Sequence, residues 1–322
     1  MPHAEFSDMP VVASDARVVV VGGANTDVVG VSTGTLVARD SNPGDIRTSP
    51  GGVGRNVAEN LARLGVDVEL VTAFGGDEAG RALMASCRSR GIGVSASLVA
   101  PDLPGAHYLA VLDERHDMAV AINDMRVLDR LTPDALAEPE RATMLLTADL
   151  VVVDANLSAD VLEWLAAVVR APIVLEPVSA AKTGRAAGIL ARLAAVTPNT
   201  LEAAKLLGHE VSGMDGAERA ARELVAAGAG SAFVTCGVAG VAWADAGGSG
   251  VVAAPVVEIA NASGAGDAFC AGIAYALLAQ AAALTAAKLG TVMAGFALAD
   301  DETVSRAITY GAASEAMKES RP

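Results

Sequence analysis

The 322-residue chain has few cysteines and histidines, and those it has show none of the spacings that bind metals. Its three cysteines, Cys87, Cys236 and Cys270, lie far apart and form no CxxC pair, which predicts small buried side chains in a reducing compartment. The four histidines lack zinc-ligand spacing and accompany no Gly-x-Ser-x-Gly elbow. These absences argue against zinc chemistry and against a serine hydrolase.

The chain also lacks any run of basic residues. Its formal net charge is −15, and its 23 lysines and arginines are scattered. Binding to nucleic acid through phosphates needs clustered positive charge, so we expect no nucleic-acid partner. An acidic protein that handled ATP would need a divalent cation and helix N-termini to offset the repulsion of the triphosphate.

A secretory signal is missing, because the first sixteen residues contain three acidic side chains and no long apolar run. We expect residues 1–16 to form a flexible tail and the protein to be cytoplasmic. The segment 269–287 is apolar over nearly the length of a membrane span, but it is mostly alanine and glycine and contains Gln280. The better prediction is one buried helix over 268–287, with no membrane interaction.

Short β-branched runs alternate with helical patterns along the chain, and the run 17–22 is typical of a strand buried on both faces. Further strands are expected at 68–72, 150–153, 173–176, 195–197 and 232–235, and helices at 51–64, 77–90, 158–169, 199–207 and 215–227. The alternation predicts an α/β fold with helices on both faces of a mainly parallel central sheet.

Two segments interrupt this alternation. Residues 30–49 and 105–123 combine short β-like pieces with Asp, Asn, Gly and Pro and have no helical periodicity. We predict that they form a small β-sheet that projects as a lid from one domain spanning 17–318. Edge strands of such a sheet can pair with a second subunit, so a homodimer through the lid is an open alternative.

The stretch from Asn261 to Phe269, Asn-Ala-Ser-Gly-Ala-Gly-Asp-Ala-Phe, carries the most chemical information. Two glycines, Gly264 and Gly266, precede Asp267 at the predicted start of a helix, where free backbone N–H groups bind anions. A carboxylate at that position would repel a phosphate, but it could accept a proton from a hydroxyl that attacks a bound phosphoryl group. The alternative is a glycine-rich turn capped by the aspartate.

Other polar residues follow the ends of predicted strands, where ligands bind in parallel sheets. Asn25 and Asp27 suit hydrogen bonds to sugar hydroxyls, although an Asx turn would also explain them. The glycines of the 51–54 cluster allow close approach of a ligand, and Asn56 could address a hydroxyl; the alternative is a flexible loop.

Two more motifs have competing interpretations. Asn199 and Glu202 share one helix face and could hold a water-rich Mg²⁺, but their spacing also fits a helix cap, which we favour for the motif in isolation. Thr235, Gly237 and Gly240 could contact nucleotide phosphates or could form a hairpin turn. Neither a Rossmann fingerprint nor a Walker A loop occurs in the chain.

In this order, the motifs resemble those of the PfkB-type, ribokinase-like carbohydrate kinases over nearly all of residues 17–315. Within the family, the chain looks most similar to pseudouridine kinases, on the segments 22–27, 40–44, 51–65, 123–125, 154–157 and 177–179. The resemblance implies a ribokinase-like three-layer sandwich and transfer of phosphate from ATP to the 5′-hydroxyl of pseudouridine, with Mg²⁺.

The resemblance also implies residue roles. Asp267 would be the general base, and the backbone at Gly264, Ala265 and Gly266 would form the anion hole. The substrate would contact Asn25, Asp27, Ser41, Asn42, Gly51, Gly52, Asn56 and Asp124. The nucleotide would lie against Asn199, Thr235, Gly237, Gly240, Ser263, Gly264 and Gly266, and Mg²⁺ would be held by Asn199 and Glu202.

Three positions depart from the family pattern. Val53 stands where ribokinases have lysine, and Glu176 stands where aspartate is commoner. Asn261 replaces an aspartate that borders a potassium site in ribokinases, so dependence on K⁺ is left open. The alternatives are a kinase for another sugar or nucleoside, such as ribose, adenosine, uridine or cytidine; a non-catalytic binding protein on the same fold; and an NAD-linked oxidoreductase, which the missing fingerprint disfavours.

Overall fold

The computed structural model describes residues 9–319 and contains one large sheet of eight strands. In spatial order these are β14 (Gly248–Val252), β13 (Val241–Asp245), β12 (Ser231–Thr235), β11 (Ala195–Val196), β10 (Ile173–Glu176), β9 (Leu150–Asp154), β1 (Arg17–Val21) and β4 (Asp67–Val71). The strands from β12 to β4 run parallel, whereas β13 and β14 are antiparallel to their neighbours. The predicted mainly parallel sheet is confirmed.

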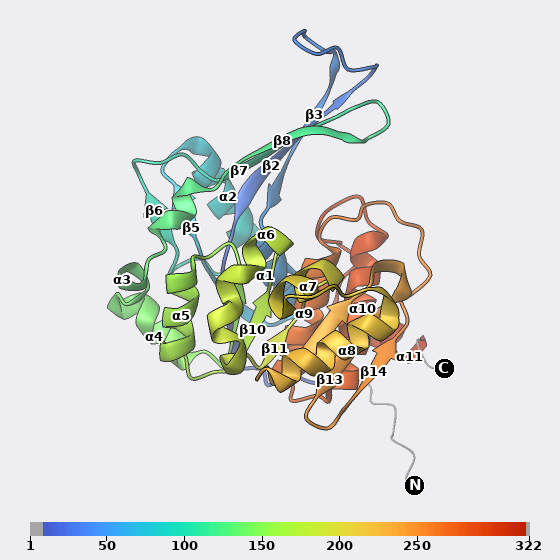
Figure 1. Ribbon diagram of the computed structural model, residues 1–322. Coiled ribbons are helices and arrows are strands. Elements are labelled where there is room, and N and C mark those ends of the chain that lie inside the picture. Colours follow the sequence, from blue (N-terminus) through green and yellow to red (C-terminus); the bar gives the residue numbers. More distant parts are fainter. Residues whose placement is uncertain (1–8, 320–322) are drawn as a thin grey trace.

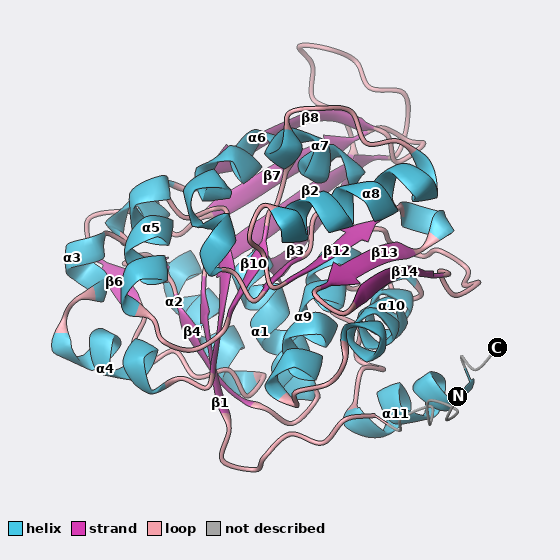
Figure 2. Ribbon diagram, turned by 60° about the horizontal axis from the view of Figure 1, so that its bottom comes forward, coloured by secondary structure: helices cyan, strands magenta, loops and turns pink. Residues whose placement is uncertain are grey.

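Helices cover both faces of this sheet, as the alternating sequence predicted (Figures 1 and 2). One face packs against α1 (Val53–Arg63), α2 (Glu78–Ser89), α9 (Ala265–Leu278), α10 (Ala283–Leu298) and α11 (Tyr310–Glu319). The other packs against α3 (Pro133–Leu136), α4 (Pro139–Thr147), α5 (Ala159–Val168), η2 (Gly184–Arg192), α7 (Thr200–Leu207) and α8 (Gly213–Ala226). Short elements α6 (Ala180–Thr183), η1 (Arg126–Arg130) and η3 (Gly237–Ala239) lie in connections.

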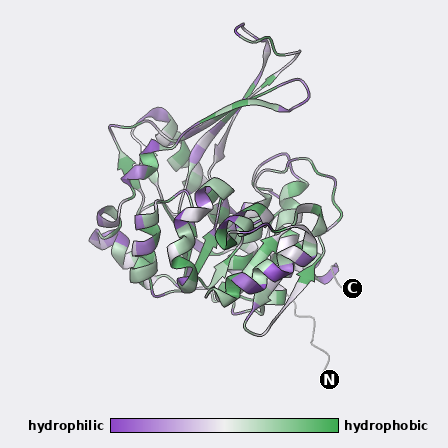
Figure 3. Cartoon of the chain, in the orientation of Figure 1, coloured by the Kyte–Doolittle hydropathy of each residue, from purple (hydrophilic) through white to green (hydrophobic). Residues whose placement is uncertain are grey.

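The core of each layer is aliphatic. Val18 to Val21 alternate between the two hydrophobic clusters, because successive strand residues point to opposite faces of the sheet. All four are fully buried, and the strands of the large sheet stand out as hydrophobic in Figure 3. A continuous β-branched run is therefore explained by burial on both faces.

A second sheet of four strands projects from this body (Figure 1). Its order is β3 (Gly44–Gly51), β2 (Asn25–Ser32), β7 (His107–Leu112) and β8 (Met118–Asp124). The segments 30–49 and 105–123 supply most of it. Its first strand begins at Asn25, so Asn25 and Asp27 lie on a strand rather than in the expected loop. A two-stranded sheet of β5 (Ala73–Gly75) and β6 (Leu98–Ala100) lies beside α2.

The prediction of one helix over 268–287 is wrong, because α9 ends at Leu278 and α10 begins at Ala283. Gln280 adopts a positive φ of 55° in the turn between them. The two helices then pack together so closely that a Cβ at Gly272 would lie 2.7 Å from the Cα of Gly290. No helix within residues 9–319 has the length and hydropathy of a membrane span.

The predicted flexible tail, residues 1–16, falls partly outside the described residues, since residues 1–8 are not described. In the remainder, Met9 is buried in the core and Val12 packs against it. Packing therefore begins before Arg17, where the domain was predicted to start.

Candidate active site

A cavity of about 1360 Å³ lies between the projecting sheet and the carboxyl ends of the large sheet. The inner face of the projecting sheet contributes Asp27, Val29, Arg47 and Tyr108 to its lining. The opposite wall contains the start of α9 and the residues that follow β10, β11 and β12. This is where a parallel sheet places its ligands, since the strand ends leave backbone and polar groups free.

Asp267 lies in the first turn of α9 and is 8% exposed. The residue before the helix, Gly264, has a φ of 83°, and a Cβ there would lie 2.1 Å from the carbonyl oxygen of Thr303. Only glycine therefore permits this tight entry, after which the N–H groups of the first turn are left without helical partners. Asp267, Gly264 and Gly266 line the same cavity, and the roles of general base and anion hole stay predictions for them.

Burial raises the pKa of Asp267 to about 6. The Asn56 hydrogen bond and the Arg55 charge act in the opposite direction, whereas Asp154 and Asp27 raise the pKa further. A carboxyl group with a pKa near 6 is ionised at neutral pH but is a better proton acceptor than an ordinary aspartate.

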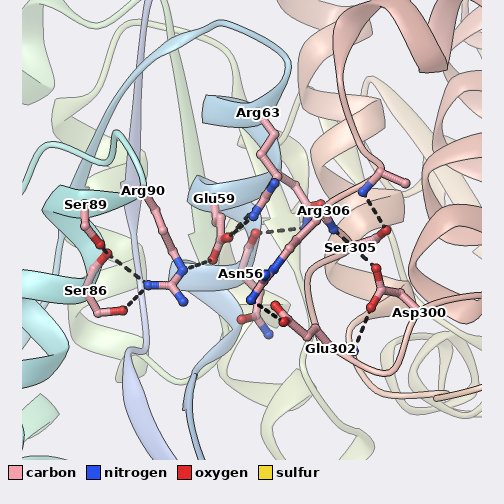
Figure 4. Close-up of polar contacts among 12 residues, drawn as sticks. Asn56, Glu59, Arg63, Ser86, Ser89, Arg90, Asp300, Glu302, Ser305 and Arg306 are labelled. Carbon is pink, nitrogen blue, oxygen red and sulfur yellow. Dashed lines mark hydrogen bonds and ion pairs between the residues drawn. The ribbon is translucent and has the colours of Figure 1, made fainter.

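Asn56 donates a hydrogen bond from Nδ2 to Oδ2 of Asp267 over 2.6 Å. This contact was not predicted, since Asn56 was expected to address a substrate hydroxyl, and α1 and α9 are 211 residues apart at this point. Arg55 donates to the other end of the Asn56 amide and to Glu59. Figure 4 shows Arg63 and Arg90 converging on Glu59 beside Asn56.

The ribose contacts predicted from the sequence come together at the base of the projecting sheet. Asn25 donates to Oδ1 of Asp27 over 2.6 Å, and both residues line the cavity with Gly52. Burial raises the pKa of Asp27. Gly51 is paired with Asn25 in the sheet, and a Cβ at Gly51 would lie 2.1 Å from Oδ2 of Asp27, so glycine makes room for the carboxylate.

Asp154 is a buried residue whose role the sequence did not reveal. Its Oδ2 accepts hydrogen bonds from the N–H groups of Gly23 and Gly54 over 2.8 and 2.9 Å. It thereby ties together the two glycine clusters that follow β1 and β3. The available signal was its position at the end of a buried strand, where an acidic residue is unusual without partners.

Asn199 and Glu202 form the helix cap that their spacing favoured. Asn199 Oδ1 accepts from the N–H of Leu201 and Glu202 over 2.9 and 3.0 Å, and Glu202 Oε2 accepts from the N–H of Asn199 over 2.8 Å. Both residues also line the cavity.

A divalent cation would suit the charge distribution beside this cap. Burial raises the pKa of Glu202, and burial together with Glu202 and Asp267 raises that of Glu176 well above its usual value. Such carboxylates supply the hard oxygen ligands that Mg²⁺ prefers. Among residues 9–319, no group of three or more His, Cys, Asp or Glu residues is arranged to hold a metal alone. A Mg²⁺ site at Asn199 and Glu202, with most of the ligands supplied by water, stays a prediction.

Several predicted contacts lie elsewhere. Ser41 and Asn42 are in the exposed loop at the tip of the projecting sheet, where Asn42 bonds to Val37, and they do not line the cavity. Asp124 pairs with Arg126 and is likewise not part of the lining. The structure thus gives no support to a substrate contact by these three residues.

Only some of the residues predicted for nucleotide binding and the anion hole line the cavity. Thr235 and Ser263 line the cavity, whereas Ala265, Gly237 and Gly240 do not. The segment 235–241 is a turn between the antiparallel strands β12 and β13, as the hairpin interpretation held. Asn261 donates to the carbonyl oxygen of Asp301 and accepts from the N–H of Ser263, so it braces the loop before α9.

Two further cavity residues were missed. Lys182 donates from Nζ to Oδ1 of Asn156 over 2.6 Å, and burial lowers its pKa. Val178 has a φ of 69°, which a β-branched residue adopts only under tertiary constraint. Val178 lies within the Glu176-Pro-Val-Ser segment and Lys182 follows it, and both line the cavity.

A family model for pfkB family carbohydrate kinases matches residues 15–308. The chain belongs to this family. It is 37% identical to pseudouridine kinase of Escherichia coli (strain K12) over 259 residues, which cover 80% of this chain and 82% of that protein. The protein is therefore a phosphotransferase with an alcohol group as acceptor.

Solved structures share the fold over almost the whole chain. A carbohydrate kinase from Agrobacterium tumefaciens superposes with a TM-score of 0.84 at 25% identity, covering 94% of this chain and 97% of that one. Arabidopsis thaliana ribokinase, complexed with ribose and ATP, has a TM-score of 0.81 at 18% identity and covers 94% and 99%. The predicted ribokinase-like sandwich is confirmed.

Proposed function

We propose that the protein transfers the γ-phosphoryl group of ATP to the 5′-hydroxyl of pseudouridine, giving pseudouridine 5′-phosphate and ADP. The observation that carries the chemistry is the buried Asp267 carboxylate at the start of α9, beside unpaired backbone donors. The choice of nucleoside is supported by the similarity to a pseudouridine kinase over 80% of the chain.

In this reaction, Asp267 accepts the proton of the 5′-hydroxyl while that oxygen forms a bond to the γ-phosphorus. The bond from this phosphorus to the bridging oxygen of ADP breaks. N–H groups of Ala265, Gly266 and Asp267 stabilise the charge on the phosphoryl oxygens, and one such donor is worth about 3–4 kcal/mol in comparable sites. The carboxylate accepts the proton, while the N–H groups bind the phosphoryl oxygens. These separate roles explain why a carboxylate lies beside an anion site.

Binding roles are assigned to the residues predicted from the sequence, most of which line the cavity. Asn25, Asp27, Gly52 and Asn56 hold the ribose in this proposal, and Gly51 leaves room for Asp27. Thr235, Ser263, Gly264 and Gly266 face the nucleotide, whereas Gly237 and Gly240 shape the turn after Thr235. Asn199 and Glu202 hold Mg²⁺ through water, and the metal would supply charge neutralisation on the triphosphate.

The projecting sheet would act as a lid. Its inner face already lines the cavity, so its closure over a bound nucleoside would exclude water and prevent simple hydrolysis of ATP. We also infer that the projecting sheet forms a homodimer with a second copy, since its edge strands can pair with another subunit. Asn261 brings an amide rather than a charge to the loop before α9, which disfavours activation by potassium.

The test is to incubate the purified protein with Mg-ATP and, separately, with pseudouridine, uridine, cytidine, adenosine and ribose, and to measure products by mass spectrometry. Much faster phosphorylation of pseudouridine supports the proposal. Preferential phosphorylation of ribose or another nucleoside would contradict the substrate and keep the Asp267 chemistry. No product with any of them would contradict both.

A further inference from the structure

The amide of Asn56 has only one orientation that satisfies its neighbours. Arg55 donates to its oxygen, and a guanidinium has donors and no acceptor, so the amide nitrogen must point the other way. There it donates to Asp267 over 2.6 Å. The orientation of this side chain is thus determined by Arg55.

Arg55 is itself held at three points. Its Nε donates to the carbonyl oxygen of Gly51 over 3.0 Å, one terminal nitrogen donates to Glu59 over 2.5 Å, and the other reaches Asn56. Arg55, Glu59 and Asn56 are all less than 5% exposed. A planar guanidinium can satisfy three such acceptors at once, whereas an ammonium group lacks this geometry.

Glu59 is in turn surrounded by cations. Arg63 donates to Oε1 over 2.8 Å, and Arg90 approaches Oε2 over 3.2 Å (Figure 4). Burying an ion pair costs desolvation energy that apolar packing would avoid. Stability alone therefore does not explain why Arg55 and Glu59 form a buried ion pair.

We propose that Arg55, clamped by Glu59, is a positioning residue for the general base: it fixes Asn56 so that the amide donates to Asp267. This inference rests on the proposed role of Asp267. A donor to the carboxylate favours its ionised form, whereas a rotated Asn56 would present its oxygen and favour the protonated form. The relay from Glu59 through Arg55 and Asn56 therefore keeps the base ready to accept a proton.

The charged and titratable groups that face Asp267 are Arg55 of α1, Asp27 of β2, Asp154 of β9, Glu176 of β10 and Cys270 of α9. Arg55 brings the only positive charge of this set. It can thus act on Asp267 by its charge or by orienting Asn56, and the experiment must separate the two effects.

The experiment compares Arg55→Met and Arg55→Lys with wild type, and uses Arg63→Met as the matched control. Arg63 is on the same helix and pairs with the same glutamate, but its recorded contacts do not include Asn56. The titration of Asp267 is followed by ¹³C NMR of labelled aspartate carboxyl groups, and its signal is assigned by its loss in Asp267→Asn. The pH profile of kcat is measured in parallel.

We expect both Arg55 variants to raise the midpoint of the Asp267 titration by about one pH unit. The acidic limb of kcat should move with it. Arg63→Met should leave the midpoint in place. If Arg55→Lys restores the wild-type midpoint, charge is sufficient and the positioning role is wrong; an unchanged midpoint in both variants also overturns it.

The NMR measurement keeps this inference separate from the proposed function. If no nucleoside is phosphorylated, the substrate proposal fails, yet the midpoint of Asp267 still decides whether Arg55 orients Asn56. If Arg55→Met does not fold, Arg55→Lys alone gives the answer.

Discussion

Folding disfavours the ionised form of Asp267, because burial raises the pKa of its carboxyl group. It shares its cavity with Asp27, Glu176 and Glu202, and Asp154 is buried close by; burial raises the pKa of each of these carboxyl groups. A protein that needed only stability would replace such groups with neutral ones. Their concentration at one end of the sheet is typical of a functional site, where stability is lost so that chemistry can occur.

Replacing Asp267 with asparagine should therefore stabilise the protein while it stops the reaction. The ordinary pKa of 3.8 rises to about 6 on folding, so the folded state binds this proton more tightly than the unfolded chain. Stability falls as pH rises between these values, and above them the ionised group costs up to about 3 kcal/mol. Asparagine has no such cost, and it cannot accept the proton.

We expect Asp267→Asn to raise the free energy of unfolding by about 1–3 kcal/mol at pH 7.5, with the gain disappearing below pH 4. Turnover should fall by about 10²- to 10⁴-fold. Urea unfolding at both pH values and steady-state kinetics measure the two effects. Asp102→Asn, at an exposed ion pair, should change stability little. Near-normal turnover would remove Asp267 as the base.

Asp27 is predicted to act on substrate binding. Asp27→Ala removes a half-buried carboxylate that lines the cavity, and a hydrogen bond from a sugar hydroxyl to such a group is worth about 1.5–3 kcal/mol. We expect KM for the nucleoside to rise by about 10- to 100-fold, with a smaller change in kcat. Kinetics at varied nucleoside and saturating ATP give both constants.

Ser41→Ala and Asn42→Ala complete this comparison. Both residues lie at the exposed tip of the projecting sheet, so their replacement should leave KM unchanged. A large increase in KM would show that the tip folds onto the substrate. An unchanged KM in Asp27→Ala would show that Asp27 only shapes the strand.

At the scale of the elements, we propose two roles for the first turn of α7. Asn199 and Glu202 cap this helix, and we propose that they also hold Mg²⁺ through water. The two tasks can be separated, because capping needs an acceptor oxygen whereas cation binding needs charge. Glutamine retains the acceptor and loses the charge.

We expect Glu202→Gln to keep the stability of wild type but to raise the Mg²⁺ concentration needed for half-maximal activity by about tenfold or more. Glu202→Ala should show the same Mg²⁺ effect and also lose about 1 kcal/mol of stability. Thermal unfolding and Mg²⁺ titrations at fixed ATP measure these effects. If Glu202→Gln needs the same Mg²⁺ concentration as wild type for half-maximal activity, then Glu202 serves only as a helix cap.

At the scale of the whole molecule, the projecting sheet has two unlike faces. Its inner face lines the cavity, whereas the side chains of Ile46, Leu109, Val120 and Ile122 are exposed, between 40% and 76%. Their register places them on one side, since Leu109 is opposite Ile122 and Val111 is opposite Val120. A contiguous apolar patch on an exposed sheet is typical of an interaction surface.

The proposed homodimer predicts that Ile122→Glu will convert a dimer to a monomer in sedimentation experiments. Burying a carboxylate in an apolar interface leaves an unpaired charge, which such an interface does not tolerate. Val256→Glu, at a fully exposed residue in the 253–260 connection, should leave the oligomeric state unchanged. A wild-type protein that sediments as a monomer would contradict the dimer.

Local patterns determined the elements of the large sheet. The strands 17–22 and 150–153 were evident because burial on both faces demands continuous β-branched residues, and the cap at Asn199 was evident because it needs only neighbours in sequence. The glycine-rich start of α9 was predictable for the same reason, since the start of a helix depends on residues that are neighbours in sequence.

Tertiary structure decided what depends on partners distant in sequence. The pairing of Asn56 with Asp267 and the clamp of Asp154 on Gly23 and Gly54 join segments at least 100 residues apart. The turn at Gln280 arises where α10 packs back on α9 through Gly272 and Gly290. The sequence by itself therefore specified the chemical groups of the site, and long-range packing determined which of them meet.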